Sequence, residues 1–166
     1  WEENRRIWEE IHRIWQEIRA LRDNYEGLRK DVEALKKDVK SIRRTLENIT
    51  ISVEEEANEF IRYLLRQRGV DVETGPAVIA NREFDVYGTN GVVTVVGEAK
   101  TRVGAKTVRR VVERVGEAMK AQPEKFPGKT VVVVYCLRAA PDAVEEARKL
   151  GVWLVESGRE KTELRL

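Results

Sequence analysis

The sequence predicts an α/β protein in which a long N-terminal helix precedes a globular α/β domain. Three observations support this fold class. Apolar residues recur at alternating spacings of four and three from Ile7 to Val53. An Asn-Gly pair separates two β-branched runs, and helical and strand-like patterns alternate after it. We therefore expect residues 1–50 to form the helix and residues 51–166 the domain.

The N-terminal stripe is a sustained heptad repeat. Its a positions hold Ile11, Ile18, Tyr25, Val32, Val39 and Leu46, and its d positions hold Ile14, Leu21, Leu28, Leu35, Ile42 and Ile49. A helix of this length extends on the order of 70 Å, too far for its narrow stripe to be buried against one small domain. The stripe therefore needs a partner helix.

The charges beside the stripe favour a parallel dimer. Four g positions are acidic and four e positions, from Arg22 onward, are basic. A parallel pair therefore places Glu17 near Arg22 of the partner subunit and Asp31 near Lys36 of the partner subunit. An antiparallel pair would bring like charges together. Residues 1–50 are thus expected to form a parallel dimeric coiled coil.

Two features modify this helix near its ends. Trp1, Trp8 and Trp15 fall at e positions and indicate a larger bundle, a protein partner, or rings that lie over the neighbouring helix. The heptad fails after Val53. Ser52 and Glu55 have the spacing of a capping box, which predicts that a helix restarts near Ser52 and ends at Gly69.

Asn90-Gly91 predicts a hairpin with a two-residue turn that pairs Thr89 with Val92. The period of two then places four charged residues on one strand face, and Phe84, Val86, Val93, Val95 and Ala99 on the other. The charged residues are Glu83, Asp85, Glu98 and Lys100. Clustered carboxylates repel one another unless a cation lies between them, so a hard divalent ion fits this face best.

The remaining segments complete the domain. Short strands are expected at residues 70–73 and 77–80, separated by Gly75-Pro76. Gly104 opens a helix that Pro123 ends. A strand buried on both faces follows at residues 130–137, then a helix at residues 141–150 and a last strand at residues 152–156.

Composition limits the function classes. The net charge is only +2, which excludes a basic tail that coats nucleic acid indiscriminately. The charged fraction of 36% is compatible with a thermophilic source. Cys136 is the only cysteine and is expected to be a buried apolar residue in a cytoplasmic protein. No apolar run is long enough for a membrane span, and we expect residues to precede Trp1 because it is not Met.

Asp85, twelve residues and then Glu98-Ala99-Lys100 resemble the signature of the PD-(D/E)XK nuclease superfamily. This superfamily includes archaeal Holliday junction resolvases and many restriction endonucleases. The resemblance covers residues 52–157 and implies a restriction-endonuclease-like mixed sheet flanked by helices, although Phe84 replaces the nominal proline. Uncharacterised archaeal proteins that join a coiled coil to such a domain are similar.

The resemblance also implies roles for individual residues. Asp85 and Glu98 would hold Mg²⁺ or Mn²⁺, and Lys100 would orient the water that attacks a DNA phosphodiester. A first-helix acid often completes such a site, but no residue here is a clean match. The candidates for the third ligand are Glu83, Glu55 and Asn58, with Glu54 and Glu59 nearby.

A basic cluster follows the lysine: Arg102, Lys106, Arg109 and Arg110. It is interpreted as a DNA-backbone contact or as a solvated helix face. Two hypotheses result. The first is a homodimeric, Mg²⁺-dependent endonuclease that hydrolyses DNA. The alternative is a non-catalytic coiled-coil dimer whose degenerate nuclease-like domain binds DNA or a protein.

Overall fold

The computed structural model describes residues 1–166 and contains a long N-terminal helix followed by an α/β domain. Helix α1 spans Glu2–Arg66. The chain divides into a helical unit, Trp1–Glu47, and an α/β unit, Asn48–Leu166. No helix combines the length and the apolar character that crossing a membrane requires.

The heptad residues of the helical unit are solvent-exposed in the single chain. From Ile14 to Leu46 their exposed fractions lie between 46% for Ile18 and 67% for Leu21. Ion pairs one helical turn apart, such as Arg13–Glu17 and Arg29–Glu33, lie on the same helix. These pairs support the helix locally but bury none of its apolar stripe.

The predicted helix restart near Ser52 is wrong, because α1 continues through it without a break. Inside a continuous helix the backbone N–H groups of Ser52 and Glu55 find carbonyl acceptors in the preceding turn. A capping box is therefore not required there. The helix ends at Arg66, followed by Gly69 in the left-handed region at a φ of 73°.

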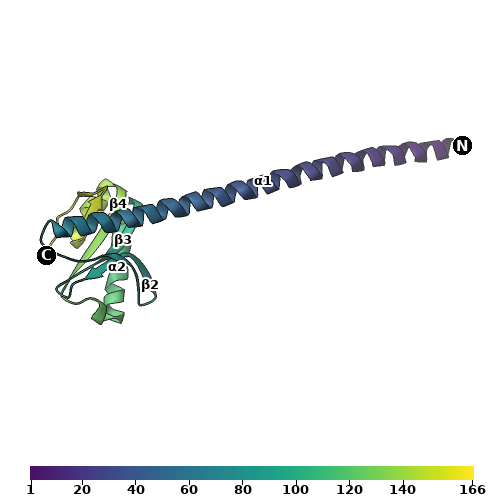
Figure 1. Cartoon of the computed structure of the whole chain (residues 1–166). Helices are drawn as coiled ribbons and strands as arrows, with labels where there is room; N and C mark the ends of the chain where they lie inside the picture. The colour runs from purple at the N-terminus through teal and green to yellow at the C-terminus, as the bar shows by residue number, and fades with distance from the viewer. The chain divides into compact units, whose positions relative to one another are not determined.

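A six-stranded mixed sheet forms the centre of the α/β unit (Figure 1). Its strands are β1 Gly75–Ile79, β2 Arg82–Thr89, β3 Val93–Val103, β4 Lys129–Ala139, β5 Trp153–Glu156 and β6 Arg159–Glu160, in that spatial order. Pairings are antiparallel from β1 to β3, parallel from β3 to β5, and antiparallel between β5 and β6.

Two strand predictions need correction. Residues 70–73 are irregular rather than a strand, although Val72 is buried. Gly75-Pro76 belongs to β1 instead of separating two strands. The first error arises because a short apolar run does not reveal whether a partner strand is available to it. The second arises because Gly and Pro usually mark a turn, but β1 is an edge strand, where Pro is tolerated. The two-residue β6 was not predicted.

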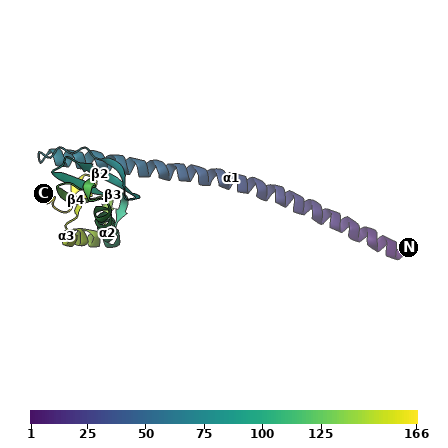
Figure 2. The same cartoon turned by 90° about the horizontal axis from the view of Figure 1, so that it is seen from below.

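Helices cover both faces of the sheet (Figure 2). Helix α2 Ala105–Ala121 and helix α3 Pro141–Leu150 pack on one face, and the part of α1 within the α/β unit packs on the other. Val133 and Val134 of β4 point into opposite clusters and are both fully buried. The strand buried on both faces is thus confirmed, and Cys136 is also buried as expected.

The hairpin register differs from the prediction by two residues. Thr89 pairs with Thr94 rather than with Val92. The loop is longer because the Asn90 side-chain oxygen accepts the backbone N–H groups of Val92 and Val93, at 3.0 and 2.9 Å. A shift of two residues preserves the alternation of side chains on β3.

A bulge in β2 changes the alternation that the sequence predicted. Gly75 pairs with Tyr87 and Ala77 pairs with Phe84, so Asp85 and Val86 together oppose one residue of β1. As a result, Phe84 and Val86 belong to clusters on opposite faces of the sheet. The prediction that they share a face is wrong.

Candidate functional site

The structure brings Asp85, Glu98 and Lys100 together. The Lys100 Nζ lies 3.1 Å from Glu98 Oε2 and 3.7 Å from Asp85 Oδ2. The side chains are 6% exposed for Glu98, 14% for Asp85 and 44% for Lys100. A partly exposed lysine therefore contacts two carboxylates that are almost removed from solvent.

The bulge and the end of the β2–β3 ladder position Asp85. The regular pairing stops at Val86 and Gly97. Beyond that point the Ala99 N–H donates to Asp85 Oδ2 at 2.9 Å, so the side chain accepts a hydrogen bond from β3. The Asp85 carbonyl accepts a hydrogen bond from Asn58 Nδ2 of α1 at 3.0 Å. Asp85 is thus held by a strand and a helix at once.

Sequence reasoning missed Arg114 of α2. Its guanidinium contacts the Glu98 carboxylate and donates to the Glu83 carbonyl at 2.8 Å. The same group lies over the Phe84 ring, 5.5 Å from its centroid. One signal could have revealed this residue: Arg114 continues the spacing of Lys106 and Arg110, which places the three on one helix face.

Helix α1 contributes Glu54 to the same electrostatic cluster. Burial raises the pKa of Glu54, and the charges of Asp85 and Glu83 raise it further while Lys100 opposes them. Burial likewise raises the pKa of Asp85, against the Ala99 N–H and Lys100. Glu55, which the sequence favoured over Glu54, is exposed. The acid of the first helix that faces the cluster is therefore Glu54.

Asn58 is buried and has one unsatisfied atom. Its Nδ2 donates to the carbonyls of Glu54 and Asp85, but its Oδ1 has no hydrogen-bond partner. Leaving a buried amide oxygen unpaired costs about 1–3 kcal/mol. The residue lines a shallow hollow of about 620 Å³ together with Glu54 and Glu55. Its side chain offers an oxygen acceptor beside the acids.

The donor set suits a hard divalent cation, although the side chains do not yet surround one. Four carboxylates (Glu54, Glu83, Asp85 and Glu98) and two cations (Lys100 and Arg114) carry a formal net charge of −2, which one divalent ion would balance. No group of three acids is close enough to enclose a metal. Lys100 and Arg114 each contact one Glu98 oxygen, so a cation would displace at least one of them.

The predicted basic cluster is only partly available. Arg102, Lys106 and Arg110 are exposed and form no ion pair. Arg109 pairs with Glu146 of α3 at 3.3 Å. Lys106 and Arg110 lie on the stripe of α2 that ends at Arg114, so exposed positive charge runs along the helix toward the carboxylates.

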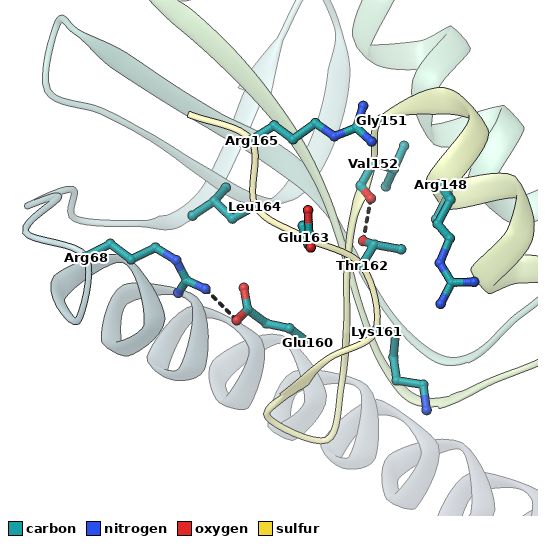
Figure 3. A pocket seen from close by; sticks show the side chains of 11 residues that line it. Arg68, Arg148, Gly151, Val152, Glu160, Lys161, Thr162, Glu163, Leu164 and Arg165 are labelled. Atoms are coloured by element: carbon teal, nitrogen blue, oxygen red, sulfur yellow. Dashed lines mark hydrogen bonds and ion pairs between the residues drawn. The ribbon is translucent and has the colours of Figure 1, made fainter.

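A second hollow, of about 630 Å³, lies beside the C-terminal segment (Figure 3). Arg68 pairs with Glu160 across it at 2.5 Å, and the Thr162 hydroxyl donates to the Val152 carbonyl at 2.6 Å. None of the residues predicted as catalytic, metal-binding or DNA-binding lines this hollow. The Arg68–Glu160 and Thr162–Val152 contacts already stabilise the C-terminal segment.

Together these features define the class of protein: an α/β domain that has a bulged mixed sheet and a lysine between two carboxylates. The chain belongs to the family described as a domain of unknown function (DUF8196), which matches residues 55–164. The matched range includes Asp85, Glu98, Lys100 and Arg114. No curated protein and no solved structure matches the chain.

Proposed function

We propose that the protein is a metal-dependent endonuclease of the PD-(D/E)XK type that hydrolyses DNA phosphodiester bonds as a homodimer. The single observation that most supports this proposal is the position of Lys100 Nζ, within 4 Å of both Asp85 and Glu98. These three residue types at this spacing are the ones that the resemblance assigns to catalysis.

Each residue has a distinct role in the proposed mechanism. Asp85 and Glu98 would bind Mg²⁺ or Mn²⁺, with Glu54, Glu83 or the Asn58 oxygen as further ligands. A cation held there would supply Lewis acidity at the phosphate. Lys100 would orient the attacking water and offset the negative charge that develops on the phosphate. Arg114 would hold the Glu98 carboxylate in place from α2.

The homodimer is proposed from the heptad repeat. The apolar stripe of the helical unit is exposed from Ile14 to Leu46, and its acidic g and basic e positions suit a parallel partner. A second copy of the same helix would cover the stripe and pair these charges. Trp1, Trp8 and Trp15 are exposed at that end, where a further protein partner would bind.

The alternative is a non-catalytic dimer whose nuclease-like domain binds DNA or a protein. Two observations favour it: Asn58 rather than an acid occupies the first-helix position, and Glu98 is already paired with Lys100 and Arg114. A domain without catalysis has no evident need for a lysine among acids, however. Lys100 is therefore the residue that best separates the two hypotheses.

The test is a cleavage assay with Mg²⁺ on linear, flapped and branched DNA. We expect Lys100→Ala to lower the cleavage rate by at least about 100-fold, the scale of a lost positioned catalytic group. Lys149→Ala is the matched control, because Lys149 is an exposed lysine of α3. No cleavage by the wild-type protein, or equal rates for wild type and Lys100→Ala, would contradict the enzymatic hypothesis.

A further inference from the structure

Two arginines lie side by side where β3 and β4 end. Arg102 is directly paired with Arg138 in the parallel ladder. Both residues are exposed, and neither forms an ion pair. Like charges at paired positions of a sheet repel each other, and an anion between the guanidinium groups would offset this repulsion.

A hollow lies at this pair. It has a volume of about 320 Å³ and is lined by Arg102, Val103, Arg138, Ala139, Ala140 and Pro141. The hollow sits at the carboxyl ends of two adjacent parallel strands, which is where open α/β sheets bind ligands. Helix α3 begins here at Pro141, and its N-cap Ala140 provides no side-chain cap.

The nearby acids offset only part of the charge of the two arginines. Glu156 interacts electrostatically with Arg138, but its carboxylate also accepts the Ala139 N–H at 2.7 Å and pairs with Lys161 at 3.3 Å. Asp142, in the first turn of α3, lies beside Gly104 at the start of α2. Positive charge therefore remains in excess at the hollow.

We propose that Arg102 and Arg138 form a binding site for a phosphodiester of the DNA backbone, an inference that rests on the proposed action on DNA. Each guanidinium presents a fork of N–H donors that matches two phosphate oxygens. Lys100 precedes Arg102 by two residues on β3, so their Cα atoms are roughly 7 Å apart. A backbone that contacts Arg102 and Arg138 is thereby brought close to Lys100.

The test measures binding without cleavage. A fluorescent DNA duplex is titrated with the full-length protein in EDTA over a series of KCl concentrations, and binding is followed by anisotropy. Each phosphate contact contributes about −0.9 to the slope of log K against log[salt]. We expect Arg102→Gln combined with Arg138→Gln to reduce the steepness of this slope by about 0.9, each single variant to reduce it by less, and all three to weaken binding.

Two further variants make the result specific. Arg148→Gln, in the last turn of α3, removes the same charge from an exposed position that does not line the hollow at Arg102 and Arg138. It should leave the slope unchanged. Arg138→Lys retains the charge and should restore most of the slope. Unchanged slopes in the Arg102 and Arg138 variants, or an equal loss in Arg148→Gln, would overturn the proposal.

The outcome is independent of catalysis. Failure of Mg²⁺-dependent cleavage by the wild-type protein would contradict the endonuclease hypothesis but would leave the salt slopes in EDTA unaffected. Conversely, an unchanged slope would overturn the Arg102–Arg138 site even if the protein cleaves DNA. Circular dichroism of each variant confirms that the fold is retained before slopes are compared.

Discussion

Apolar side chains of helix α1 are exposed in the helical unit and buried in the α/β unit. In the helical unit, Leu28 and Leu35 are 63% and 61% exposed. In the α/β unit, Ile61 and Leu65 of the same helix α1 are fully buried against the sheet. An apolar helical stripe therefore indicates that burial is needed, but only its surroundings show whether the chain itself provides it.

Charged side chains show the same contrast. The Arg13–Glu17 pair of the helical unit is largely exposed, and such a pair contributes at most about 0.5 kcal/mol. Asp85 and Glu98 of the α/β unit are mostly buried and contact a shared lysine. Removing one charge should therefore change the free energy of unfolding strongly in the α/β unit and weakly in the helical unit.

The largest effect is expected at the exposed stripe. Leu28→Asp combined with Leu35→Asp would bury charges in the proposed dimer seam at about 3–5 kcal/mol each, raising the dimer dissociation constant by more than about 1,000-fold. Sedimentation equilibrium measures this. Lys30→Asp with Lys37→Asp, at outward heptad positions, is the matched control. A wild-type chain that is monomeric at micromolar concentration would rule out the dimer.

The next effect concerns the buried end of the same helix. Ile61→Ala should lower the free energy of unfolding of the α/β unit by about 2–5 kcal/mol, because it leaves a cavity under the sheet. Ile51→Ala should change it by less than about 0.5 kcal/mol, because Ile51 is exposed. Urea unfolding followed by near-UV circular dichroism compares the two. Similar losses in both variants would contradict the observed packing.

The smallest effect is expected at the site and depends on pH. The folded pKa of Asp85 lies above its ordinary value of 3.8. Its ionised form is thus disfavoured by folding, and stability falls as the pH rises from the ordinary pKa through the folded pKa. Asp85→Asn removes this loss and should therefore raise the free energy of unfolding at pH 7.

Mg²⁺ should reverse the order of stability, so that the wild-type protein becomes more stable than Asp85→Asn. It should raise the melting temperature of the wild-type protein, because a ligand that binds only the folded state stabilises it, and should have little effect on Asp85→Asn. Asp71→Asn, at an exposed carboxylate, is the control for both measurements. Equal melting shifts with Mg²⁺ in wild type and Asp85→Asn would count against the metal site.

The sequence predicted much of the fold and the centre of the candidate site. Period-two alternation on β3 placed Glu98 and Lys100 together, and it was insensitive to the error of two residues in the hairpin register. The bulge at Asp85 was not predictable from local pattern, because it depends on how β1 pairs with β2. Phe84 was consequently assigned to the wrong face.

By itself the sequence determined the heptad stripe, the order of most elements, and the spacing of Asp85, Glu98 and Lys100, since these follow from local periodicity. Only the tertiary structure selected Glu54 over Glu55, added Arg114 to Glu98, and paired Arg102 with Arg138. These contacts join residues from different elements, and their geometry depends on strand order and helix docking, which are set by packing of the whole domain.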